Sequence, residues 1–174
     1  DFILAGIFLG LGLLGYSAFR IVPLVVLMAV VIYVLHQRDG AKRKEAWWAL
    51  GIMMIFAIVL ALPLIHFAIQ YPDAFNYRSI SRMTSVESQI SGSVIGVFFS
   101  NTWNALMMPI WKDGSTWVIS VTDRPSLDVV TAAIYIIGLV VVIARWIKKR
   151  NWQDMFTIFA IPALMLPSIM ALAF

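Results

Sequence analysis

The residues with the clearest capacity for chemistry lie in one short stretch, GLLGYSAFRIVP at positions 12–23. It places a fixed positive charge, Arg20, and a phenol, Tyr16, between apolar runs at residues 2–14 and 21–35. A guanidinium keeps its charge and binds phosphate through a planar fork of N–H donors. The pattern is typical of an anion site at a membrane edge. It is equally typical of an interfacial arginine whose charged end extends to water, and both interpretations stay open.

The two apolar runs are together too long for one membrane span, because about twenty residues cross the hydrocarbon core. We therefore expect the chain to turn between them, with Gly15 supplying backbone freedom at the turn. Pro23 suits the first turn of the second helix, since its missing N–H would be unpaired there in any case. The turn would hold Arg20 at a membrane boundary between two short helices.

Composition places the chain among membrane proteins. It is 61% hydrophobic and 13% charged, whereas soluble domains carry about 25% charged residues. The absence of cysteine from the sequence excludes disulfides and thiolate metal sites. The net charge of +4 comes largely from two basic clusters beside apolar runs, so it does not indicate nucleic-acid binding. We predict an all-α polytopic membrane protein with about five transmembrane helices and one interfacial or re-entrant outer helix.

The expected spans follow the apolar runs, at residues 2–14, 21–35, 46–69, 129–144 and 155–174. Segments 71–93 and 112–128 are polar and are expected to be outer loops. Between these loops, residues 94–111 are apolar but contain polar interruptions at Ser100, Asn101 and Asn104 and a proline at 109. Such a segment suits a helix that lies in the interface rather than crossing it.

Two smaller patterns concern helix packing. Gly6 and Gly10 form a pair of small residues four apart, which favours close helix contact. Ordinary glycine use in a membrane helix explains the pair equally well. Pro162 and Pro167 lie inside the last apolar run, where they are expected to kink a helix or shift its path.

Orientation follows from the basic residues. The clusters at 38–44 and 145–150 hold eight of the thirteen Lys and Arg residues, four in each. Both clusters are therefore expected in the cytoplasm. The polar segments 15–22, 71–93 and 112–128 would then converge on the outer face of the cytoplasmic membrane.

The distribution of polar groups favours some functions over others. The spans contain almost no ionisable residues, which disfavours an ion channel or a proton-coupled carrier. The polar groups gather instead at the outer interface, where an enzyme would use a lipid-linked phosphate. Phosphate or sugar could be held by Arg20, Arg78, Arg82 or Arg124. Hydroxyls or a cation could be oriented by Asp73, Asp113, Asp123 or Asp128. For every one of these except Arg20, a solvated loop charge is the competing interpretation.

Three pieces of the sequence, taken in order, resemble bacterial GT-C membrane glycosyltransferases of the family-39 type. These are relatives of the protein O-mannosyltransferases and of the lipid A aminoarabinose transferase. The first piece is GYSAFRIVP at 15–23, which follows a glycine-rich span. The second is YPDAF at 71–75 with Arg78, and the third is RPSLD at 124–128, directly before a span.

The resemblance implies transfer of a sugar from a polyprenyl-phosphate donor to an acceptor outside the membrane, where the acceptor is a protein, lipid or glycan. It implies that Arg20 and Tyr16 bind the donor phosphate, and that Arg78, Arg124 and Asp128 are candidates for substrate binding. The family's catalytic acid lies in a first outer loop that this sequence does not contain. We therefore expect an internal fragment of a longer protein, inactive alone. No cofactor is established, and a divalent metal is a candidate.

Two functions from other classes remain as alternatives. One is a non-catalytic membrane protein, such as a lipid-handling or assembly subunit, and the other is half of a transporter. An acidic residue in a large outer loop upstream of Asp1 would favour the transferase. An inverted repeat of these spans would favour the transporter.

Overall fold

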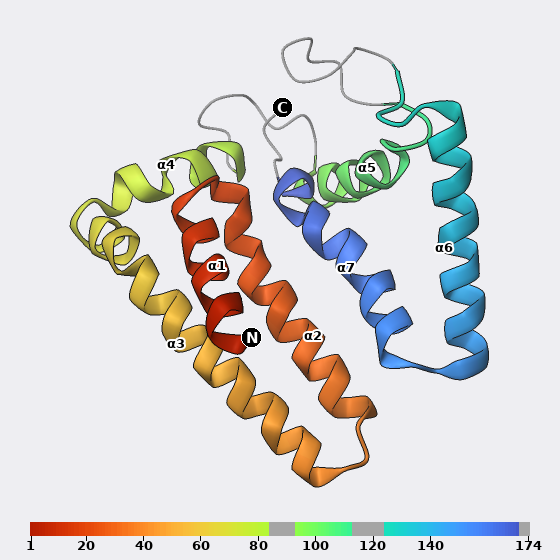
Figure 1. The fold of residues 1–174 in the computed structure, drawn as a ribbon. Helices are drawn as coiled ribbons and strands as arrows, with labels where there is room; N and C mark the ends of the chain where they lie inside the picture. Colours follow the sequence, from red (N-terminus) through yellow and green to blue (C-terminus); the bar gives the residue numbers. More distant parts are fainter. Residues whose placement is uncertain (84–92, 113–123, 171–174) are drawn as a thin grey trace. The chain divides into compact units, whose positions relative to one another are not determined.

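The computed structural model describes residues 1–83, 93–112 and 124–170, and the regular structure within them is entirely helical (Figure 1). This confirms the all-α prediction. The elements in chain order are α1 (Phe2–Leu14), a short 3-10 helix η1 (Ser17–Ile21), α2 (Val22–His36), α3 (Gly40–Gln70), α4 (Pro72–Met83), α5 (Val94–Met107), α6 (Val129–Lys149) and α7 (Trp152–Ile169).

The chain forms two compact units. The first contains Asp1–Arg78 and Asn151–Leu164, and the second contains Ser79–Arg150 and Met165–Phe174. Within the first unit, α1, α2 and α3 lie side by side, with α2 running opposite to the other two (Figure 1). This unit carries the Tyr16–Arg20 turn.

Glycines bring α1 unusually close to α3. A Cβ added to Gly6 would lie 2.5 Å from the carbonyl oxygen of Met53, and one added to Gly10 would lie 2.9 Å from that of Ala57. The opposing surface of α3 is also made of small residues, since Ala57 and Ala61 are 1% and 4% exposed. The expectation of close contact through the glycine pair is therefore confirmed.

Three helical segments within the described part of the chain are long and apolar enough to cross a membrane: Ser17–His36, Gly40–Gln70 and Val129–Lys149. The thirteen residues of α1 reach only about 20 Å at roughly 1.5 Å per residue, less than a hydrocarbon core of about 30 Å. The eighteen residues of α7 include Asp154 near their start. A membrane protein is thus supported by length and composition, while the count of five spans is not confirmed.

The polar segment 71–93, expected as a loop, is helical over Pro72–Met83. Pro72 occupies the first turn, where a missing N–H costs nothing, and Asp73 in that turn complements the helix dipole. The segment expected as an outer loop therefore contains a helix over these residues, which its polar composition alone did not indicate.

Other helix boundaries extend beyond the apolar runs. Helix α3 begins at Gly40 inside the basic cluster, because the Asp39 carboxylate accepts a hydrogen bond from the Ala41 amide at 2.9 Å. Helix α6 likewise continues to Lys149. Helix α7 continues as one element through Pro162 and Pro167.

The interrupted segment 94–111 contains helix α5, which covers fourteen residues. At roughly 1.5 Å per residue it spans about 21 Å, short of a bilayer core. Ile95, Phe99 and Trp103 are spaced four apart and are all exposed, at 65% or more. An apolar face of this kind agrees with an interfacial helix, and its depth in a membrane stays a prediction.

Candidate functional site

The position of Arg20 is set by its neighbour Phe19. A Cβ on Gly12 would overlap the ring of Phe19, so the absence of a side chain at Gly12 lets the ring lie against α1. This contact fixes η1 at the end of α1, and Arg20 lies in the last turn of η1. Substituting Gly12 would therefore displace the turn that carries the arginine.

Backbone hydrogen bonds close the turn on both sides. The Gly15 amide donates to the Gly12 carbonyl at 3.1 Å, and the Phe19 amide donates to the Tyr16 carbonyl at 2.9 Å. Gly15 has a φ of −84°, so the turn does not use the left-handed conformation in which glycine is favoured. Pro23 lies in the first turn of α2, as expected. The predicted turn between two helices is thus confirmed.

The Arg20 guanidinium is half-buried and is covered by an aromatic ring from α4. Its Cζ lies 3.9 Å from the centroid of the Phe75 ring, within the range of a cation–π contact. Its Nε is buried and has no hydrogen-bond partner among the described residues. A buried donor left unpaired costs about 1–3 kcal/mol, so an acceptor oxygen placed at this edge would recover that free energy.

The structure brings some of the predicted site residues together. Tyr16 precedes η1 directly and its side chain is 65% exposed, so its phenol lies in the same turn as Arg20 but faces solvent or lipid. The backbone of Arg78 lies in α4, three residues beyond Phe75 and therefore about one helical turn away. Its side chain lies outside the described structure.

Phe75 is the contact that sequence reasoning missed. It stands in the YPDAF motif, but only its charged neighbours were considered as candidates. The sequence feature that could have marked Phe75 is an aromatic residue at the start of a helix, beside a predicted membrane boundary. That feature does not identify Arg20 as its partner, because the two residues are 55 positions apart and only the fold brings them together.

Arg124 and Asp128 belong to the second unit. Arg124 is exposed. Asp128 caps α6: its carboxylate accepts hydrogen bonds from the amides of Val130 at 3.0 Å and Thr131 at 3.1 Å, and from the Thr131 hydroxyl. These bonds, led by the one from the Thr131 hydroxyl, lower the pKa of Asp128 below its usual 3.8. Helix capping therefore accounts for Asp128, and its role in substrate binding stays a prediction.

The remaining acidic candidates do not form a metal site in the described part of the chain. Asp73 is exposed in the first turn of α4, while Asp113 and Asp123 lie outside the described residues. Among the described residues, no group of three or more His, Asp and Glu side chains could hold a metal ion. The side chain of Arg82 also lies outside the description.

The site that the structure defines is therefore a half-buried cation at a helix turn, covered by Phe75 and with one donor unsatisfied. It can bind an oxyanion by charge and hydrogen bonding. Comparison with protein-family models, with curated proteins and with solved structures finds no match for this chain.

Proposed function

We propose that the chain is part of a membrane glycosyltransferase and that Arg20 binds the phosphate of a polyprenyl-phosphate sugar donor. The observation that supports this proposal is the buried, unpaired Nε of a guanidinium whose face is covered by Phe75. With one face covered, the N–H edge is left for the planar, bidentate contact that arginine makes with phosphate.

An apolar surface for the polyprenyl chain begins beside the arginine. Leu24, Leu27 and Val31 are 54%, 40% and 36% exposed, and their spacing places them on one side of α2. Leu24 lies about one turn beyond Arg20. An isoprenoid chain on this stripe would bring its phosphate to the turn, where the cation is.

The proposed chemistry separates charge stabilisation from proton transfer. As the sugar leaves the donor, negative charge develops on the phosphate, and a prepositioned guanidinium stabilises it. Arg78, Arg124 and Asp128 are proposed to contact donor or acceptor. The acceptor hydroxyl would be activated by an acidic residue upstream of Asp1, as the resemblance to the GT-C family implies.

We further propose five spans, with this turn on the outer face of the cytoplasmic membrane.

A non-catalytic lipid-handling subunit is the second candidate. It would use the same contact between Arg20 and a lipid phosphate. Among the described residues Arg20 forms no ion pair with a carboxylate, so its charge is left for a lipid phosphate in either candidate. The two candidates differ in whether sugar is transferred once the lipid is bound.

The test is sugar transfer by the full-length protein from a defined polyprenyl-phosphate sugar donor. Arg20→Ala should lower the transfer rate by about ten- to a hundredfold, because charged hydrogen bonds contribute roughly 1.5–3 kcal/mol. Arg20→Lys should keep part of the activity, since lysine retains a charge without the fork.

Arg82→Ala is the matched control, because Arg82 lies near the C-terminal end of α4. It should lower the transfer rate much less than Arg20→Ala does. Near-normal transfer by a folded Arg20→Ala protein would contradict the proposed role of Arg20. Binding of the donor without any transfer by the wild-type protein would favour the lipid-handling subunit.

A further inference from the structure

A single residue, Tyr71, joins the end of α3 to the start of α4. The Tyr71 amide donates to the Phe67 carbonyl at 2.8 Å, and the Tyr71 carbonyl accepts a hydrogen bond from the Phe75 amide at 2.9 Å. The Tyr71 ring also packs against the Phe67 ring, with the centroids 5.5 Å apart. The first turn of α4 is therefore attached to the last turn of α3 by backbone bonds and a ring contact.

Phe75 is the residue of α4 that faces the turn. Among the side chains of α4 that the structure describes, only Phe75 is partly buried. Its ring centroid lies 3.9 Å from Cζ of Arg20. Asp73, two residues earlier, points about 200° away around the helix axis and is exposed. The aromatic residue of the YPDAF motif, rather than its carboxylate, thus meets Arg20.

The ring and an oxyanion would use different parts of the guanidinium. At 3.9 Å there is no room for an N–H group between Cζ and the ring, so the guanidinium lies flat on Phe75. Its N–H donors lie in its plane, whereas the attraction to the ring acts on its face. The Nε donor is buried and has no partner among the described residues. An oxyanion approaching in the plane can pair with this edge while the ring stays in place.

Arg20 is positioned at both ends. Phe19, packed where Gly12 has no side chain, fixes the backbone of η1. Phe75 fixes the far end of the Arg20 side chain. A long side chain loses rotamer freedom when a ligand immobilises it. A contact that orders the side chain in advance reduces this loss and so raises affinity for the ligand.

We propose that Phe75 is a positioning residue for the phosphate site, which holds the Arg20 guanidinium so that its N–H edge is directed at the lipid phosphate. This inference rests on the proposed function, in which Arg20 binds that phosphate. It gives α4 the role of setting the direction of the cation. Because the contact acts through the negative face of the ring, the electron density of the ring matters as well as its size.

The direct test compares the affinities of the full-length protein for a polyprenyl phosphate and for the corresponding polyprenol, by native mass spectrometry. Phe75 is replaced by mono-, di- and trifluorophenylalanine, which keep the shape of the ring and withdraw charge from its face. The preference for the phosphate should fall with each fluorine, by about three- to tenfold over the series, as expected for a partly desolvated cation–π contact. Affinity for the polyprenol should not change.

Natural side chains provide a second measurement. Phe75→Leu keeps an apolar contact but loses the ring, so the preference for the phosphate should fall at least as far as in the trifluoro protein. Phe75→Tyr keeps the ring and should retain the wild-type preference. Fluorination changes the volume of the ring little, so the fluorinated proteins should fold even if the Phe75→Leu protein does not.

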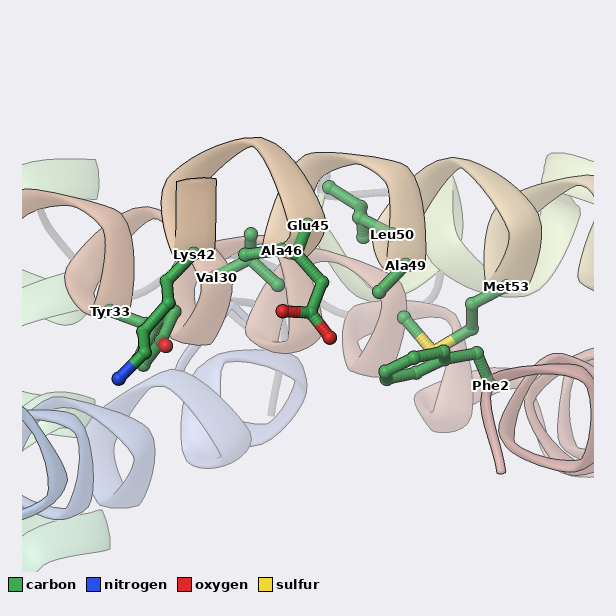
Figure 2. Close-up of a pocket in the computed structure, with 9 residues that line it drawn as sticks. All are labelled: Phe2, Val30, Tyr33, Lys42, Glu45, Ala46, Ala49, Leu50 and Met53. Atoms are coloured by element: carbon green, nitrogen blue, oxygen red, sulfur yellow. The ribbon is translucent and has the colours of Figure 1, made fainter. Parts of the chain in front are cut away.

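Two controls match these variants in ring chemistry and in charge. Trifluorophenylalanine at Phe67, whose ring packs against Tyr71, should leave the preference unchanged. Lys42→Gln removes a positive charge near the other end of α3, where Lys42 lines a pocket with Tyr33 and Glu45 (Figure 2). The helix between Lys42 and Tyr71 is about 44 Å long at roughly 1.5 Å per residue, beyond a screening length of about 10 Å. This variant should also keep the preference.

The wild-type protein shows first whether the phosphate site exists. If it binds the phosphate and the alcohol equally, the proposed function and the role of Phe75 both fail. If it prefers the phosphate and the fluorinated proteins keep that preference in full, Phe75 contributes packing alone. The positioning role is then wrong, while the proposed function stands.

Discussion

Arg20 and Asp128 are both charged residues beside apolar helices, but their surroundings give them different roles. The Asp128 carboxylate is engaged by the backbone and side chain of the helix that it begins. The Arg20 guanidinium is covered by a ring and keeps a buried donor unpaired among the described residues. A cap explains the first residue without a ligand, whereas the second is explained better with one.

The capping role of Asp128 predicts a pH dependence. Its pKa is lowered in the folded protein, so the carboxylate stabilises the start of α6 above the usual pKa of about 3.8. This stabilisation is lost as the pH falls below that value through the lowered pKa. Amide exchange at Val130 and Thr131, corrected for its intrinsic pH dependence, should show protection at neutral pH that Asp128→Ala removes.

Asp128→Asn is the matched control, because asparagine also caps helices and does not titrate. It should keep most of the protection and lose the pH dependence. If exchange at Thr131 is the same in the wild type and in Asp128→Ala, the carboxylate is not the cap.

At the scale of helices, the contact between α1 and α3 depends on Gly6 and Gly10. Gly6→Ala should lower the thermal midpoint of unfolding, because a Cβ there would lie 2.5 Å from a backbone oxygen of α3. Overpacking of this kind typically costs about 1–3 kcal/mol. The measurement is the midpoint of thermal unfolding in detergent, with the folded fraction at each temperature monitored by size-exclusion chromatography.

Gly51→Ala on α3 is the control, since a Cβ there meets nothing within 4 Å. It should leave the midpoint unchanged or raise it, because alanine is the better helix former. A Gly6→Ala protein as stable as the Gly51→Ala protein would show that α1 does not need close contact with α3.

How far the sequence predicts these elements depends on the signal that each one carries. The turn at Tyr16–Arg20 was predictable because two apolar runs exceed one bilayer thickness and are separated by glycine, arginine and proline. Helix α4 was not predicted, because its polar sequence has no apolar run to mark it. The Arg20–Phe75 contact could not be predicted, because it depends on the tertiary packing that brings α4 to the turn.

At the scale of the whole molecule, the basic clusters predict the topology. Single cysteines at Gly40 and Ser115 can be introduced without background, since the sequence has no cysteine. An impermeant thiol reagent applied to intact cells should label the Ser115→Cys protein and spare the Gly40→Cys protein. Labelling after lysis is the control for reactivity. Labelling of Gly40→Cys alone in intact cells would invert the orientation and place the Arg20 turn in the cytoplasm.

The central claim is that Arg20 binds a lipid phosphate, and direct binding tests it without requiring catalysis. The measurement compares a polyprenyl phosphate with the corresponding polyprenol, titrated into the full-length protein and its Arg20→Gln variant by native mass spectrometry. The wild type should bind the phosphate at least about tenfold more tightly than the alcohol, as expected for charged hydrogen bonds. Arg20→Gln should lose this preference while binding the alcohol unchanged. An equal preference for the phosphate in a folded Arg20→Gln protein would contradict the claim.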